Sequence, residues 1–196
     1  MKLLLASDTD FVYEKGSDLL GIPKEKLNVA YISTAGKGSE HPHIPDKKRL
    51  NQMKEYHATS YDIEGKREDE LRQFVSDKNV IWVGGGNTFY LLKAIKTTGF
   101  DKIIKEEIAK GKAYIGVSAG SYIACPTIEV ATWRETNRHG VTDLLALNLV
   151  PFVIKAHYVP EMASVLKAKI KNCKYEVKIL NDNQAILVND DGYSLV

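Results

Sequence analysis

The segment Ala113-Tyr-Ile-Gly-Val-Ser-Ala-Gly-Ser-Tyr122 decides the fold of this 196-residue chain. Its first five residues form an uninterrupted apolar run, which is typical of a strand covered on both faces. Small residues follow Val117, and a helix-like segment comes after them. A buried strand that leads through a tight turn into a helix is the repeating unit of α/β proteins. The segment therefore predicts a parallel sheet flanked by helices.

The rest of the chain repeats this alternation. Four more apolar runs are predicted as strands: Lys2–Ala6, Asn28–Ser33, Tyr56–Ile63 and Val80–Val83. Charged stretches between and after them are predicted as helices: Lys47–Tyr56, Glu68–Val75, Asn87–Thr97 and Phe100–Lys110. Asn- and Asp-rich turns separate three C-terminal runs, which predicts antiparallel strands at Tyr175–Leu180, Gln184–Val188 and Tyr193–Val196. We expect one α/β domain over residues 1–196, with a doubly wound, mostly parallel sheet.

Composition and charge argue against several classes of protein function and location. With 27 Lys and Arg against 25 Asp and Glu, the chain is too balanced in charge to bind nucleic acid by charge alone. The N-terminus becomes charged too early for a signal peptide, and Asn148 and Pro151 interrupt the apolar stretch Leu144–Ile154. We therefore expect a cytoplasmic protein without a membrane segment. The sequence leaves open whether it forms a homodimer and whether Cys125 and Cys173 matter.

Residues Gly116 to Gly120 have the form Gly-x-Ser-x-Gly between a strand and a helix, which is the context of a nucleophile elbow. Small neighbours allow a substrate to approach the Ser118 hydroxyl, and the Ala119 N–H points toward a developing oxyanion. The alternative interpretation is a glycine-rich turn whose serine caps the helix. The loop histidines His41 and His43 are interpreted as solvated side chains rather than metal ligands.

A serine hydroxyl needs a general base, which is usually histidine. Of the five histidines, His157 is the preferred candidate for this base. It follows the strand-like run Val153–Ala156, and sites in parallel α/β sheets form at the carboxyl ends of strands. A second glycine cluster, Gly84-Gly-Gly-Asn-Thr88, lacks both the dinucleotide fingerprint and the P-loop lysine. We expect a substrate to be bound there, by Gly85, Gly86, Asn87 and Thr88, together with Ala119 as the second oxyanion donor. The alternative is a tight turn.

Along the chain, the Gly84–Thr88 cluster is followed by the Gly116–Gly120 motif, by Cys125-Pro-Thr-Ile and by His157-Tyr. In this order the motifs resemble the S51 peptidases, the family of aspartyl dipeptidase (peptidase E) and, more distantly, cyanophycinase. The resemblance implies an α/β fold of the class I glutamine amidotransferase-like type. It implies Ser118 as the nucleophile, His157 as the base, and the Gly86 and Ala119 amides as the oxyanion hole. It implies no cofactor and no metal.

The acid of the triad is where the chain departs most from the family. The family has been described with an acid late in the chain, and Asp182 falls at about that place. An earlier Asp has also been assigned this role; its position here corresponds to Trp133, with Glu129 and Glu135 nearby. We expect Asp182 and keep Glu135 as the alternative. Aspartyl dipeptidases also carry an arginine downstream of the histidine. Since Glu161–Lys167 contains none, aspartyl specificity is not expected.

The predicted function is a serine peptidase that hydrolyses small peptides, in the manner of a dipeptidase, through an acyl-enzyme on Ser118. The alternatives are an amidase or esterase with the same machinery, and a non-catalytic binding module that retains the fold. A carboxylate against His157 would favour an enzyme. The expected partner is a small peptide substrate, and neither nucleic acid nor a membrane.

Overall fold

The computed structural model describes residues 1–40, 46–190 and 192–196, so His41 and His43 lie outside the described residues. The strands in this part are β1 (Leu3–Ala6), β2 (Val29–Ile32), β3 (Ala58–Tyr61), β4 (Val80–Val83), β5 (Ala113–Val117), β6 (Val153–Lys155), β7 (Val177–Ile179), β8 (Ala185–Asn189) and β9 (Gly192–Leu195). The α-helices are α1 (Thr9–Leu20), α2 (Thr34–Lys37), α3 (Lys47–Glu55), α4 (Glu68–Ser76), α5 (Thr88–Thr98), α6 (Phe100–Ala109), α7 (Ala119–Ala124) and α8 (Ala163–Lys171). Short 3-10 helices are η1 (Lys24–Lys26), η2 (Glu129–Trp133) and η3 (Pro160–Met162).

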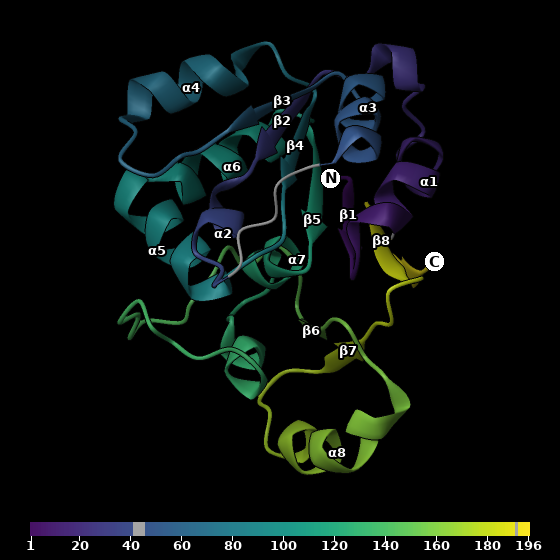
Figure 1. Ribbon diagram of the computed structural model, residues 1–196, viewed down its shortest axis with the longest axis vertical. Helices are drawn as coiled ribbons and strands as arrows, with labels where there is room; N and C mark the ends of the chain where they lie inside the picture. Colours follow the sequence, from purple (N-terminus) through teal and green to yellow (C-terminus); the bar gives the residue numbers. More distant parts are fainter. Residues whose placement is uncertain (41–45, 191) are drawn as a thin grey trace.

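Seven strands form the central sheet in the order β3-β2-β4-β5-β1-β8-β9. The five strands from β3 to β1 are parallel to one another. The last two, β8 and β9, are antiparallel. This confirms the mostly parallel sheet with antiparallel C-terminal strands. The parallel strands lie centrally in Figure 1, with helices on both sides and a smaller lobe that contains β6, β7 and α8 below them.

The prediction for β7 was wrong in its partner and direction. Instead of joining the antiparallel strands, β7 pairs parallel with β6 in a separate two-stranded sheet. The physical reason is α8, which the sequence analysis did not identify: a helix between two strands returns the chain so that both run in one direction. Helix α1 was missed as well, although Asp8 accepts a hydrogen bond from Asp10 N at its start and Gly21 ends it in the left-handed conformation.

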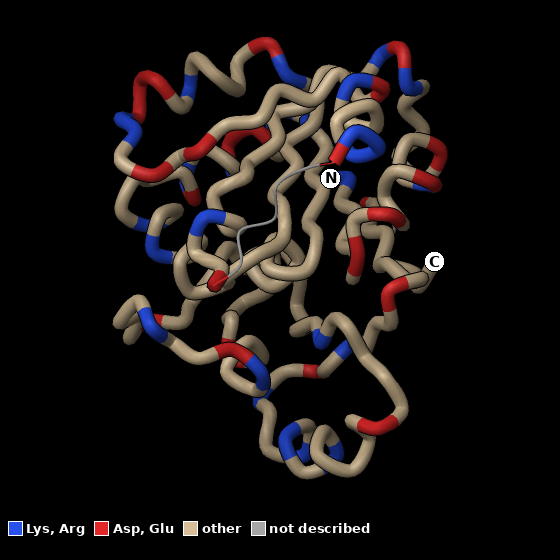
Figure 2. The backbone as a smooth tube through the Cα atoms, viewed as in Figure 1, with Lys and Arg blue, Asp and Glu red and all other residues tan. Residues whose placement is uncertain are grey.

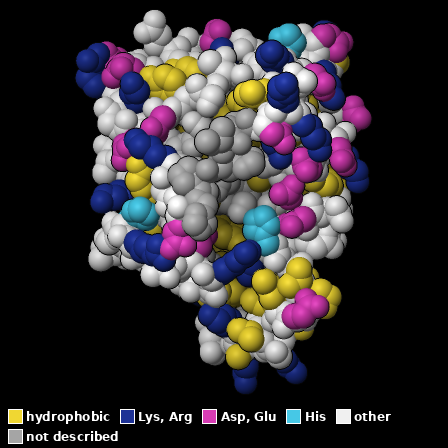
Figure 3. Space-filling view, viewed as in Figure 1, with side chains coloured by type: hydrophobic (Ala, Val, Ile, Leu, Met, Phe, Trp, Pro, Cys, Tyr) yellow, Lys and Arg dark blue, Asp and Glu magenta, His cyan; other side chains and the backbone are white. Residues whose placement is uncertain are grey.

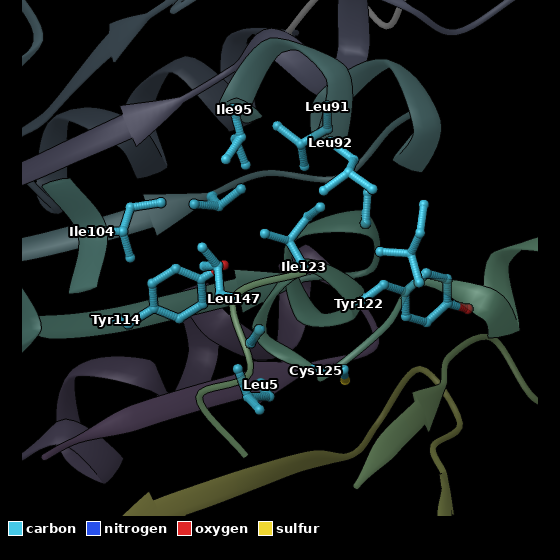
Figure 4. Close-up of a cluster of buried hydrophobic side chains, with 14 of the residues drawn as sticks. Leu5, Leu91, Leu92, Ile95, Ile104, Tyr114, Tyr122, Ile123, Cys125 and Leu147 are labelled. Carbon is cyan, nitrogen blue, oxygen red and sulfur yellow. The ribbon is translucent and has the colours of Figure 1, made fainter. Parts of the chain in front are cut away.

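Two buried clusters sandwich the sheet, because successive strand residues point to opposite faces. In β1, Leu3 and Leu5 belong to the cluster under α4, α5, α6 and α7. Leu4 and Ala6 belong to the other cluster, under α1. Figure 4 shows the first cluster, with Leu91, Leu92 and Ile95 facing Ile123 and Leu147. Coverage of both faces explains why the inner strands β1, β4 and β5 have no polar alternation, and it agrees with the doubly wound arrangement.

Charges of both signs alternate along the outer segments in the view of Figure 2. This agrees with the formal net charge of +2. Among residues 1–40, 46–190 and 192–196, no helix is both long and apolar enough to span a bilayer.

Candidate active site

Ser118 stands at a strained turn between β5 and α7. Its φ of 50° and ψ of −107° are unusual for a residue other than glycine. Glycine is required at positions 116 and 120, because a side chain there would clash with nearby backbone. A Cβ on Gly120 would lie 2.1 Å from the Val83 carbonyl oxygen, and one on Gly116 would lie 2.7 Å from Gly120. The Gly-x-Ser-x-Gly pattern therefore reflects a turn packed directly against β4.

Hydrogen bonds fix this turn to the ends of two strands. The Ser118 N–H donates to the Ala6 carbonyl of β1 at 3.0 Å. The buried Ser121 hydroxyl lies 2.8 Å from both the Ala6 and the Gly116 carbonyl oxygens. Tyr114 donates its hydroxyl to the Gly120 carbonyl at 2.7 Å. The Ser118 side chain is thus presented from a rigid support at the carboxyl edge of the sheet.

A chain of hydrogen bonds leads from Ser118 to Asp182. Ser118 Oγ lies 2.9 Å from His157 Nε2, and His157 Nδ1 lies 2.7 Å from Asp182 Oδ1. The small sheet explains this meeting, because β6 and β7 run parallel with Lys155 opposite Ile179. The residues that follow both strands therefore come together. Side-chain exposure is 29% for His157 and 58% for Asp182.

Asp182 occupies a tight turn between β7 and β8. The Asn183 N–H donates to Asn181 Oδ1 at 2.9 Å, and the Gln184 N–H donates to the Asn181 carbonyl at 3.1 Å. Asn and Asp favour such turns because their side chains bond to nearby backbone. Asp182 is therefore both a turn residue and the carboxylate that contacts His157.

Ser7 was missed by the sequence analysis and belongs to the same network. It directly follows β1, is fully buried, and donates its hydroxyl to Asp182 Oδ1 at 2.8 Å. Ser7 Oγ in turn accepts the His157 backbone N–H at 2.8 Å. His157 has a φ of 57°, so the Ser7 contact supports a strained residue. The available signal was its place at the carboxyl end of a predicted strand.

The glycine loop after β4 lies beside Ser118. A Cβ on Gly85 would lie 3.4 Å from the Ser118 Cβ. Gly86 has a φ of 141°, and a Cβ there would lie 2.2 Å from the Ala35 carbonyl group, so no larger residue fits. Asn87 caps α5 by accepting the Tyr90 N–H. Backbone therefore approaches the serine without intervening side chains.

The predicted substrate-binding residues differ in which N–H groups are available. The Asn87 N–H donates to the Ala35 carbonyl at 2.9 Å, and the Thr88 N–H donates to Glu135 at 2.8 Å. Within the described part of the chain, the Gly86 and Ala119 N–H groups have no acceptor. These two groups can donate to a ligand, while the amides of Asn87 and Thr88 are already used.

Glu135, the alternative acid, is placed elsewhere. Its carboxylate accepts the Thr88 N–H at 2.8 Å and the Thr88 hydroxyl at 2.6 Å, and among the described residues it makes no hydrogen bond to His157. Burial raises its pKa, and the Thr88 hydrogen bonds oppose that rise. Glu129 accepts a hydrogen bond from Cys173 Sγ. The structure thus sets Asp182, and neither glutamate, against the imidazole.

A cavity of about 220 Å³ opens beside Ser118. It is lined by Gly86, Ser118, Tyr122, Val130, Ala131, Arg134, Glu135 and His157. A larger hollow of about 450 Å³ shares Gly86, Arg134 and Glu135 with it. The Tyr122 hydroxyl accepts the Ala156 N–H at 3.2 Å and so joins this cavity to the end of β6. The larger hollow falls within the range of about 300–1,000 Å³ that is usual for small-ligand pockets.

Both cysteines are free thiols. Burial raises the pKa of Cys125 to about 12, which keeps it protonated at neutral pH. Burial and the contact with Glu129 raise the pKa of Cys173. Neither thiol has the electropositive surroundings that activate a cysteine nucleophile.

Comparison with known proteins agrees with this architecture. The family model described as peptidase family S51 matches residues 11–196. An uncharacterized peptidase of Pasteurella multocida is 30% identical over 97% of this chain and 94% of its own length. Peptidase E of a Nostoc species is 28% identical, over 97% of this chain and 76% of its own. A Listeria monocytogenes protein solved as a candidate peptidase E superposes with a TM-score of 0.82 at 27% identity, covering 100% of this chain and 97% of that one. The chain belongs to peptidase family S51.

Proposed function

We propose that this chain is a serine-type peptidase that hydrolyses dipeptides and other small peptides through an acyl-enzyme on Ser118. One observation carries the proposal: the continuous chain of hydrogen bonds from Ser118 through His157 to Asp182 at a strained elbow. Membership of a peptidase family supports hydrolysis of a peptide bond. The carboxylate on His157 favours an enzyme over a binding module that merely retains the fold.

Acylation begins when His157 Nε2 accepts the Ser118 proton while Oγ bonds to the scissile carbonyl carbon. The carbonyl π electrons move to its oxygen, which becomes an oxyanion. The free N–H groups of Gly86 and Ala119 are suited to donate to that oxyanion. Asp182 accepts the His157 Nδ1–H, selects the tautomer with a basic Nε2, and stabilises the imidazolium that forms.

The intermediate collapses when the C–N bond breaks and the imidazolium gives its proton to the leaving amine. This leaves an ester on Ser118 and a neutral His157. A water molecule then loses a proton to Nε2, attacks the ester carbonyl, and releases the carboxylic acid as Oγ regains the proton. The scheme uses this chain's side chains, two amides and water. It therefore calls for no cofactor.

The size of the site supports small substrates. The cavity beside Ser118 has about 220 Å³, and Tyr122 and Val130 are among its lining residues. An acyl portion of one residue suits this space better than an extended polypeptide. The class I glutamine amidotransferase-like assignment of the fold is also part of this proposal; the sharp turn from β5 into α7 supports it.

Labelling with a fluorophosphonate tests the nucleophile directly. The reagent is expected to add to Oγ of Ser118, and mass spectrometry of the digested protein should find the adduct on the peptide that contains residue 118. Ser118→Ala should abolish labelling, while Ser164→Ala, which changes an exposed serine of α8, should not. Labelling of another residue, or equal labelling of Ser118→Ala, would rule out the mechanism.

A further inference from the structure

The ammonium group of Lys155 is buried and has too few hydrogen-bond acceptors around it. It ends β6 and is 2% exposed, and among the described residues its Nζ donates only to the adjacent Ala156 carbonyl. An ammonium has three donors, and no carboxylate in the described part of the chain forms an ion pair with this one. Burial and the positive charge of Arg134 lower its pKa, and the carboxylates of Asp182 and Glu135 oppose that shift. Because burying an unpaired charge is costly, such a group points to an anionic ligand.

Lys155 lines a cleft of about 340 Å³ between β6 and α8. Apolar side chains form its walls, chiefly Trp133, Val159, Met162, Val165 and Leu166. Two further cations, Arg134 and Lys169, and one carboxylate, Glu161, also line it. Figure 3 shows hydrophobic side chains gathered on the lower lobe, with Lys and Arg beside them. The cleft thus combines apolar walls with an excess of positive charge.

The cleft continues toward the imidazole. Val159, Met162 and Arg134 also line a hollow of about 350 Å³ together with His157 and Asp182. Arg134 reaches the cavity that contains Ser118 as well. A general acid must face the amine that it protonates. In the proposed mechanism, the amine therefore leaves at His157 Nε2, in the cavity beside Ser118, and Arg134 lines both this cavity and the cleft.

We propose that this cleft is the leaving-residue subsite, in which Lys155 and Arg134 bind the free C-terminal carboxylate of the substrate and the walls receive an apolar side chain. The proposal rests on the proposed peptidase function and names its substrate class, peptides with an apolar C-terminal residue. A dipeptide places this carboxylate two bonds beyond the leaving nitrogen, so it lies close to that nitrogen. Longer peptides and C-terminal amides present no negative charge there.

The test compares alanyl-leucine with alanyl-leucinamide, which differ only in the terminal charge. A charge-assisted hydrogen bond of about 1.5–3 kcal/mol corresponds to a preference of about 10- to 100-fold in kcat/KM for the free acid. Lys155→Met keeps the side-chain length without the charge and should bring the ratio close to one. Lys167→Met, an exposed lysine of α8, is the matched control and should keep the full preference.

A second measurement separates this inference from the proposed mechanism. Leucine and leucinamide are titrated into wild-type protein by calorimetry, without turnover. Leucine is expected to bind at least about tenfold more tightly. Equal binding of both compounds, or binding of neither, would overturn the subsite whatever the peptidase assays show. Loss of turnover in Ser118→Ala with unchanged leucine binding would support both proposals independently. If Lys155→Met does not fold, the wild-type comparisons still decide the matter.

Discussion

Replacing Asp182 by Asn tests which carboxylate orients His157. The substitution keeps the size of the side chain and removes its charge at 2.7 Å from His157 Nδ1. An amide that presents its NH₂ group to Nδ1 favours the tautomer whose Nε2 carries the proton, and this Nε2 cannot accept the Ser118 proton. Loss of such an acid costs about 10⁴-fold in kcat when geometry is preserved. This corresponds to about 5 kcal/mol of transition-state stabilisation.

The assay measures kcat and KM for alanyl-leucine in Asp182→Asn, Glu135→Gln and wild type. We expect kcat of Asp182→Asn to fall nearly as far as that of Ser118→Ala, with KM little changed, and Glu135→Gln to be mild. Asp190→Asn, which changes another largely exposed acid, is the control and should match wild type. Severe loss in Glu135→Gln with a mild Asp182→Asn would move the acid to Glu135. Two mild variants would refute the triad.

Three further variants probe the support of the site. Ser7→Ala leaves the His157 N–H without its acceptor. It should lower the free energy of unfolding in urea titrations by about 1–3 kcal/mol and also lower kcat. An unchanged kcat would show that Ser7 does not position His157. Lys155→Met should raise Tm at pH 7, because the lowered pKa of Lys155 in the folded protein means that its charge destabilises the fold below that pKa. The gain in Tm should shrink as pH rises from the folded pKa toward the unfolded pKa of about 10.4. A gain in Tm that does not depend on pH would contradict this. Gly120→Ala should lose about 1–3 kcal/mol or more, because its Cβ would meet the Val83 carbonyl at 2.1 Å; wild-type urea midpoints would refute the packing argument.

The centre of the sheet was predictable because β1, β4 and β5 are buried on both faces. Continuous apolar runs such as Val80–Val83 are distinctive, and the structure has a strand at each predicted run, although the run from Tyr56 yields a strand only over Ala58–Tyr61. Tyr56 instead ends α3. Helix α8 escaped prediction because it is short and buries only Leu166. Without it, the parallel pairing of β6 and β7 had no basis in the sequence.

The site was predictable where local sequence fixes local geometry. Ser118 and the glycines around it predict a crowded turn, and His157 directly follows an apolar run that predicts a strand. The choice between Asp182 and Glu135 depended on pairing between segments distant in sequence, which no local pattern encodes. Ser7 and Lys155 were harder still. A serine after a strand is common, and the burial of Lys155 depends on how the smaller lobe packs.

Turnover by wild type and Ser118→Ala, measured side by side on a panel of dipeptides, tests the central claim most directly. The substitution removes only the hydroxyl that contacts His157, and a cooperative thermal transition in each protein checks that both are folded. We expect hydrolysis by wild type and a loss of kcat of at least about 10⁴-fold in Ser118→Ala. Turnover by Ser118→Ala within tenfold of wild type would contradict it.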